Sequence, residues 1–68
     1  MYCSTSNSRV DVYEDGGRLA RRIIVNGTVE SAYMSGDDKV VITYSRGDFR
    51  YTELWETSGR LIRRNSCR

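Results

Sequence analysis

Short glycine-centred turns divide this chain, and their length restricts its fold more than any other feature. The segments between them are rich in β-branched and aromatic residues, which is typical of strands. The connecting stretches EDGG, NG, SGDD, RG and ETSG are each two to four residues long. Parallel strands need a crossover of about a dozen residues or more, so connections this short predict an antiparallel meander. Asn26-Gly27 is the strongest turn signal, because a type I′ hairpin turn needs positive φ at both central residues.

We predict about six strands in one all-β domain that spans residues 9–64. The predicted strands are Arg9–Tyr13, Arg18–Val25, Thr28–Met34, Lys39–Ser45, Asp48–Trp55 and Arg60–Arg64. Residues 1–8 are polar and are expected to form a flexible N-terminal arm, and residues 65–68 a C-terminal tail. The antiparallel sheet is expected either to curl or to close into a small barrel, whose inside suits aliphatic side chains.

The size and composition of the chain argue against an enzyme. A chain of 68 residues has a thin core and little room for a deep pocket. It has no histidine, which is the usual general base and metal ligand, and one lysine, Lys39. We therefore expect a non-enzymatic protein with no cofactor, no metal and no small-molecule substrate. With neither a signal-peptide pattern nor a run of about 20 apolar residues, we expect a cytoplasmic protein without a membrane partner.

An internal repeat relates two of the predicted hairpins. Residues 12–22 read VYEDGGRLARR and residues 54–64 read LWETSGRLIRR. At an offset of 42 positions, six of the eleven residues are identical. Turn chemistry explains the shared glycine, because hairpins reuse glycine where the backbone is left-handed. It does not explain the shared arginine pairs, Arg21-Arg22 and Arg63-Arg64, so the sequence predicts two structurally equivalent hairpins.

The predicted register separates the side chains into two faces. Turn lengths pair Tyr13 with Arg18 and Trp55 with Arg60, and they bring Tyr51 opposite Arg64. The aliphatic face collects Val10, Val12, Leu19, Ile23, Val25, Ala32, Met34, Val41, Leu54 and Leu61. The other face collects Tyr13, Tyr33, Tyr44, Phe49, Tyr51 and Trp55, with Ile24, Val29, Val40, Ile42, Ile62 and several arginines. Two alternatives stay open: a β-bulge would move everything beyond it to the other face, and the aromatic rings would form the core if the faces are reversed.

The aromatic and arginine side chains of the second face form the predicted binding site. Its residues are Tyr13, Arg18, Arg22, Tyr33, Tyr51, Trp55, Arg60 and Arg64. Tyrosine, tryptophan and arginine are enriched at binding hot spots, so we expect a small binding or regulatory protein. It would form a homo-oligomer or bind a partner protein. The alternative is a module that binds single-stranded nucleic acid by base stacking, although a formal charge of only +2 argues against it.

The two cysteines, Cys3 and Cys67, lie near opposite ends of the chain. They are expected either to be free thiols or to form a disulfide that joins the two ends. Closing a loop this long would stabilise the fold by about 4 kcal/mol in the chain-entropy model. A closed barrel would bring the two thiols together, so the disulfide alternative depends on closure of the sheet.

Overall fold

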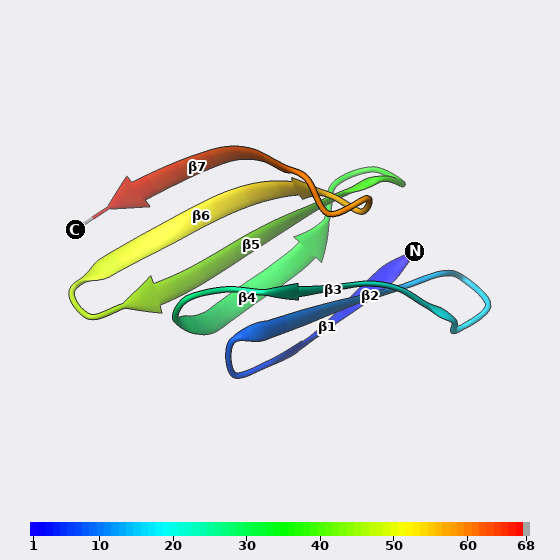
Figure 1. The fold of residues 1–68 in the computed structure, drawn as a ribbon, viewed down its shortest axis with the longest axis horizontal. Helices are drawn as coiled ribbons and strands as arrows, with labels where there is room; N and C mark the ends of the chain where they lie inside the picture. The colour runs from blue at the N-terminus through cyan, green and yellow to red at the C-terminus, as the bar shows by residue number, and fades with distance from the viewer. Residues whose placement is uncertain (68) are drawn as a thin grey trace.

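The protein forms seven antiparallel strands in two sheets, as the computed structural model, which describes residues 1–67, shows (Figure 1). The strands are β1 (Tyr2–Ser6), β2 (Arg9–Tyr13), β3 (Leu19–Ile24), β4 (Thr28–Met34), β5 (Lys39–Arg46), β6 (Phe49–Glu56) and β7 (Leu61–Cys67). Strands β1 to β3 make a three-stranded sheet and β4 to β7 a four-stranded sheet, each in chain order. Within residues 1–67 there is no helix, which confirms the all-β antiparallel prediction. The sheets curl together without closing into a barrel.

The predicted N-terminal arm is wrong, because residues 2–6 form strand β1. This strand pairs along the whole of β2, from Tyr2 opposite Tyr13 to Ser6 opposite Arg9. Asn7 adopts a φ of 45°, which lets a two-residue turn join the strands. The serine-rich composition concealed the strand because most of its side chains are exposed. Residues 65–67 likewise belong to β7 rather than to a tail, and Arg68 lies outside the described residues.

Asn26-Gly27 does not form the predicted hairpin turn. It carries the chain from one sheet to the other, and neither residue has positive φ. The turn between β1 and β2 holds this crossing in place: the Val25 amide donates to the Ser8 carbonyl at 2.8 Å, and the Val29 amide to the Asn7 carbonyl at 2.6 Å. Asn-Gly predicts a hairpin turn because both residues readily adopt positive φ. Here the glycine is needed for a different reason: its lack of a side chain lets the backbone approach β5 closely.

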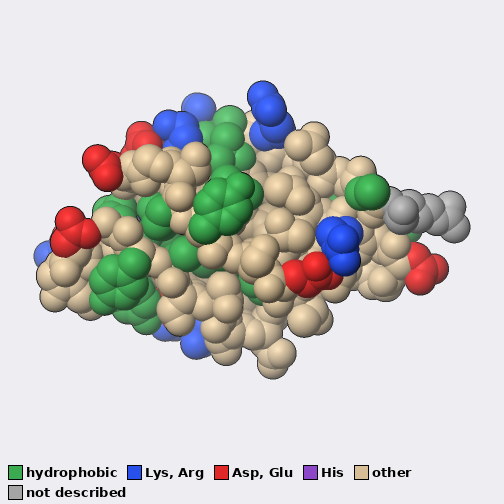
Figure 2. Space-filling view, turned by 180° about the vertical axis from the view of Figure 1, so that it is seen from behind, with side chains coloured by type: hydrophobic (Ala, Val, Ile, Leu, Met, Phe, Trp, Pro, Cys, Tyr) green, Lys and Arg blue, Asp and Glu red, His purple; other side chains and the backbone are tan. Residues whose placement is uncertain are grey.

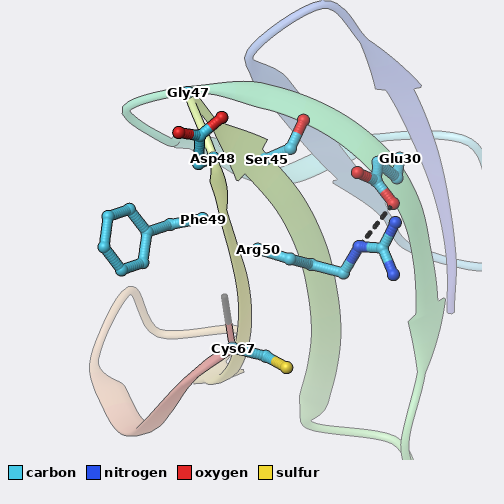
Figure 3. Close-up of a pocket in the computed structure, with 7 residues that line it drawn as sticks. All are labelled: Glu30, Ser45, Gly47, Asp48, Phe49, Arg50 and Cys67. Atoms are coloured by element: carbon cyan, nitrogen blue, oxygen red, sulfur yellow. Dashed lines mark ion pairs between the residues drawn. The ribbon is translucent and has the colours of Figure 1, made fainter.

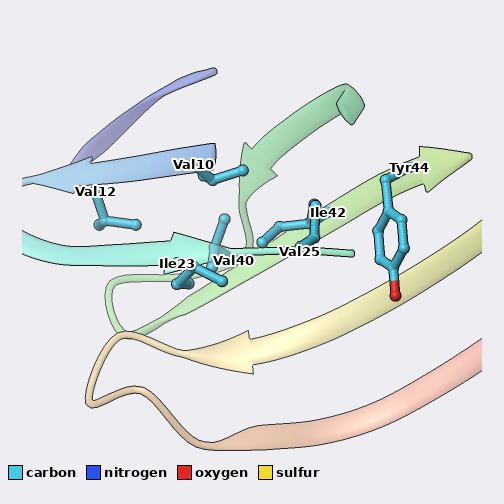
Figure 4. Packing of buried hydrophobic residues seen from close by; sticks show 7 residues of the cluster. All are labelled: Val10, Val12, Ile23, Val25, Val40, Ile42 and Tyr44. Atoms are coloured by element: carbon cyan, nitrogen blue, oxygen red, sulfur yellow. The ribbon is translucent and has the colours of Figure 1, made fainter. Parts of the chain in front are cut away.

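The core lies between the two sheets and takes its side chains from β2, β5 and the β3 region (Figure 4). Its buried members are Val10, Val12, Ile23, Val25, Val40, Ile42 and Tyr44. The aliphatic face was therefore predicted correctly for Val10, Val12, Ile23 and Val25. Ala32 and Met34 of the same predicted face are partly buried and pack against the cluster.

The pairing of β4 with β5 is shifted by one residue from the predicted register, and this shift reverses the predicted faces for the second half of the chain. Met34 lies opposite Val40, whereas the predicted pairing placed it opposite Lys39. Because successive side chains of a strand point to opposite faces, a slip of one residue exchanges the two faces. The even-numbered residues of β5 therefore point into the core, and Val41 and Leu54 point outward. The alternative with reversed faces holds for β5, β6 and β7.

The two repeated hairpins have the same turn, as the repeat predicted. In the β2–β3 hairpin the Glu14 amide donates to the Arg18 carbonyl at 2.8 Å, and in the β6–β7 hairpin the Glu56 amide donates to the Arg60 carbonyl at 2.8 Å. The turn glycines have φ values of +94° and +103°, a conformation that side chains resist.

A β-bulge follows at the same point of each hairpin, between Val12 and Tyr13 and between Leu54 and Trp55. The bulges place Leu19 opposite Tyr13 and Leu61 opposite Trp55, so the predicted pairs with Arg18 and Arg60 are wrong. They also remove both leucines from the predicted aliphatic face, and each is 38–42% exposed.

No disulfide joins Cys3 and Cys67, so the disulfide alternative is wrong. The N-terminus, where β1 starts, and the C-terminal end of β7 lie toward opposite ends of the long axis (Figure 1). Cys3 is partly buried beside the core, and its burial raises the pKa of the thiol. Without closure of the sheet, nothing brings the two thiols together.

Replacing Gly27 with alanine is expected to destabilise the fold. An added Cβ would press on the Ser45 carbonyl oxygen and come within 2.8 Å of the Tyr44 ring, so β5 would have to shift. We expect a loss of about 1–3 kcal/mol in the free energy of unfolding, measured by urea denaturation. Gly16→Ala is the matched control, because a Cβ there meets nothing within 4 Å. Equal stability of the two variants would contradict this account of Gly27.

Candidate functional site

The structure does not bring the eight predicted binding residues to one face. Tyr13 and Arg22 lie on the outer face of the three-stranded sheet, and Tyr33 lies on the outer face of the four-stranded sheet. A third group faces the other sheet and comprises Tyr51, Trp55 and Arg64. The remaining two, Arg18 and Arg60, flank the hairpin turns and pair with Glu14 and Glu56. The predicted continuous aromatic and arginine face is therefore wrong.

The inward-facing group surrounds a buried carboxylate, Glu53, which is 1% exposed. Tyr44 donates a hydrogen bond to its Oε2 at 2.6 Å, and Trp55 Nε1 donates to its Oε1 at 2.8 Å. Arg64 Nε donates to Oε2 at 2.7 Å and supplies the opposite charge. A buried carboxylate is costly unless it is paired and hydrogen-bonded, and these three donors meet that need. Glu53 is thus a structural centre of the four-stranded sheet.

The rings around Glu53 stack on one another. The Tyr44 and Tyr51 ring centroids are 5.1 Å apart, and the Arg64 guanidinium lies 5.9 Å from the Tyr51 centroid. The predicted contact between Tyr51 and Arg64 therefore exists, although the backbone partner of Tyr51 is Ser66. Burial, followed by the hydrogen bond to Glu53, raises the pKa of Tyr44 to about 12. These aromatics belong to the packed interior edge and not to an open stacking platform.

The equivalent position in the first hairpin is also a buried carboxylate. Asp11 stands 42 positions before Glu53 and is 6% exposed. Arg22 Nε donates to it at 2.9 Å from the neighbouring strand, as Arg64 does to Glu53, and Arg9 Nε lies 3.4 Å away. Sequence reasoning missed both acids because it began the repeat one residue later, at Val12. Extending the repeat back by one position would have found the pair.

The outer face of the three-stranded sheet carries a cluster of exposed apolar side chains. Tyr2, Leu19 and Ile24 are 49%, 42% and 64% exposed. Tyr2 stacks on Tyr13 with ring centroids 5.2 Å apart, and Leu19 lies opposite Tyr13 in the next strand. We call Tyr2, Tyr13, Leu19 and Ile24, together with the Asp11–Arg22 pair between them, the outer apolar face. It contains two of the predicted site residues.

Most of the arginines are already paired with carboxylates. Arg18 lies 3.2 Å from Glu14, Arg60 lies 3.0 Å from Glu56, and Arg22 and Arg64 hold the two buried acids. The count of ten arginines in the sequence therefore overstates the positive charge that is open to a ligand.

A hollow of about 280 Å³ lies beside the β5–β6 turn of the four-stranded sheet (Figure 3). Its lining residues are Glu30, Ser45, Gly47, Asp48, Phe49, Arg50 and Cys67, none of which belongs to the predicted site. Arg50 Nε lies 3.1 Å from Glu30, so the hollow presents a neutralised ion pair. Across residues 1–67, no three His, Cys, Asp or Glu side chains gather as metal ligands. The described part of the chain also contains no helix able to cross a membrane.

Comparison with known proteins adds no assignment: no family model, curated protein or solved structure matches the chain.

Tyr44→Phe is expected to change the pH dependence of stability. The pKa of Tyr44 rises from about 10 in the unfolded chain to about 12 in the fold, so its stabilising effect is complete below pH 10 and is lost as the pH rises through 12. The variant should lose about 1–3 kcal/mol near pH 8, because one donor to Glu53 disappears. Its deficit should shrink between pH 10 and 12, as measured by urea denaturation at each pH. Tyr33→Phe, at an exposed position, is the control, and a deficit independent of pH would contradict the role of Tyr44.

Proposed function

We propose that the protein is a non-enzymatic binding module that associates with a second copy of itself through the outer apolar face. The observation that carries the proposal is the exposure of Tyr2, Leu19 and Ile24 on one side of one sheet. Exposed apolar clusters rimmed by polar residues mark interaction sites on soluble proteins. The stacked tyrosines and the neighbouring arginine match the residue types that dominate protein interfaces.

The ion pairs favour a protein partner over single-stranded nucleic acid. A nucleic-acid site needs arginines that can neutralise phosphates, and each such contact makes binding sensitive to salt. Arg22 on the outer apolar face already pairs with Asp11, and Arg64 near the aromatic cluster pairs with Glu53. The rings of Tyr44 and Tyr51 are stacked on each other, which leaves fewer open ring faces for bases.

Replacing Ile24 or Leu19 with serine is expected to weaken self-association. Each change removes exposed apolar area that the partner copy would cover, so the dissociation constant should rise about tenfold or more, measured by sedimentation. The matched control is Leu61→Ser, since Leu61 occupies the place of Leu19 in the other hairpin and is 38% exposed. The control should associate as the wild-type protein does.

Two results would contradict the proposal. One is a wild-type protein that stays monomeric at millimolar concentration. The other is tight binding of a labelled oligonucleotide at low salt that falls steeply with added salt, which would favour the nucleic-acid alternative.

A further inference from the structure

The two equivalent hairpins present the same side in the same direction. In the first hairpin Val12 points into the core, whereas its equivalent in the second, Leu54, points outward. The buried acids are arranged in the opposite sense, because Glu53 faces inward and Asp11 faces outward. The hairpins are therefore related by a displacement and not by a two-fold rotation that would turn like faces toward each other.

This relation has a consequence for the outside of the molecule. The inner face of the three-stranded sheet corresponds to the outer face of the four-stranded sheet, and the inner face of the four-stranded sheet corresponds to the outer apolar face. Both halves of the internal interface thus have a counterpart at the surface. Two different faces that complement each other generate a heterologous, head-to-tail association between copies.

An arginine contact at the internal interface shows how the turn of one hairpin is held. Arg21 extends from β3 to the β6–β7 turn, where Nη2 donates to the Ser58 carbonyl at 2.6 Å and Nε to the Thr57 carbonyl at 3.3 Å. Gly59 leaves room for this guanidinium, because an added Cβ would lie 3.1 Å from its central carbon. At the end of the molecule that carries the β6–β7 turn, the two sheets are therefore joined by an arginine of β3 that donates to the carbonyls of this turn.

The equivalents of these residues are both at the surface. Arg63 corresponds to Arg21, is exposed, and has no ion-pair or hydrogen-bond partner for its side chain within residues 1–67. Asp15 and Gly16 correspond to Thr57 and Ser58, and both are exposed. The Asp15 carboxylate, whose side chain is 91% exposed, pairs with the N-terminal ammonium group, so its charge is already offset. What this surface turn offers to an arginine is therefore its backbone carbonyls, as the β6–β7 turn does to Arg21.

Apolar side chains accompany both members of this surface pair. Beside Arg63, a row across the four-stranded sheet carries Tyr33, Val41 and Leu54, of which Tyr33 is 59% exposed. Beside the Asp15 turn, the outer apolar face carries a second apolar row, which consists of Tyr2, Tyr13 and Leu19. Seen from behind, most of the visible hydrophobic side chains gather in the left half of the view, with acidic and basic side chains near them (Figure 2).

We propose that copies of the protein stack head to tail, with the outer face of the four-stranded sheet of one copy covering the outer apolar face of the next. Arg63 of the first copy donates to the carbonyls of Asp15 and Gly16 in the second, as Arg21 does to Thr57 and Ser58 within one chain. This proposal rests on the proposed self-association and names the second surface that takes part in it.

The test blocks one face at a time and then mixes the blocked proteins. Leu19→Glu blocks the outer apolar face, and Tyr33→Glu blocks the outer face of the four-stranded sheet. Head-to-tail stacking predicts that each variant alone is monomeric by sedimentation. It also predicts that an equimolar mixture forms a dimer that grows no further, because one intact face remains on each variant. Circular dichroism and thermal unfolding establish that both variants are folded.

The outcomes separate this proposal from the proposed function. If Leu19→Glu abolishes association and Tyr33→Glu does not, the outer apolar face binds its own copy and head-to-tail stacking is overturned. If the wild-type protein is monomeric, both proposals are overturned.

A second measurement examines the arginine contact itself. Arg63→Ala should raise the dissociation constant of self-association about tenfold, since a charged interface hydrogen bond is lost. Arg46→Ala is the control, because Arg46 is an exposed arginine at the far end of β5. An equal effect of the two substitutions would show only a loss of net charge and would overturn the assignment of Arg63.

Discussion

The pairing of a buried carboxylate with an arginine one strand away organises both halves of this protein. Glu53 is almost fully buried in a chain too small to supply a large apolar core, and its position is tolerated because Tyr44, Trp55 and Arg64 all donate to it. Removing one member would leave a buried charge or donor without its partner, which costs more than an ordinary surface contact contributes. Because Arg64 reaches Glu53 only in one alignment of β6 and β7, the pair also favours the observed register. Asp11 and Arg22 do the same for β2 and β3.

This arrangement explains why the aromatic side chains of β6, Tyr51 and Trp55, do not form an open binding surface. The four-stranded sheet is wider than the three-stranded sheet that covers it, so its inner face needs large side chains that can close the uncovered margin. Tyr51 and Trp55 do this: both are partly buried, pack against the aliphatic core, and keep a polar or charged neighbour at the edge. Aromatic rings with arginine among them thus form the margin of the core, which accounts for their grouping in the sequence without a ligand.

The sequence predicted the strand type, the meander and the equivalent hairpins because these depend on local signals that the structure leaves unchanged. Gly17 and Gly59 stand at turns that require positive φ, and Val10 and Val12, two positions apart in β2, both point into the core. The faces of the second half depended instead on one residue at the β4–β5 turn and on a crossing at Asn26-Gly27, neither of which turn length reveals. The prediction that the site residues share one face failed for the same reason, since Tyr33 and Tyr51 lie on the same face only if that register is correct. Strand β1 was missed because it is held by backbone pairing with β2, while its exposed serine and threonine side chains give no hydrophobic pattern in the sequence.

A repeat whose two hairpins face the same way carries a risk of open-ended association between molecules, and the outer surface differs from the repeat in a way that lowers this risk. Any face suited to the internal interface is also suited to a neighbouring molecule, so a fully apolar outer face on the four-stranded sheet would favour open-ended fibres. The sequence departs from the repeat at this point: Thr52 and Asn65 stand where the first hairpin has Val10 and Ile23. Thr52 lies 3.4 Å from Thr43 through their hydroxyls, and this part of the face is polar. In the proposed stacking, the contact between copies is therefore limited to the end that carries Tyr33, Leu54 and Arg63. In this stacking, the polar side chains of Thr52 and Asn65 reduce the apolar area between copies, which favours a reversible association over open-ended fibres.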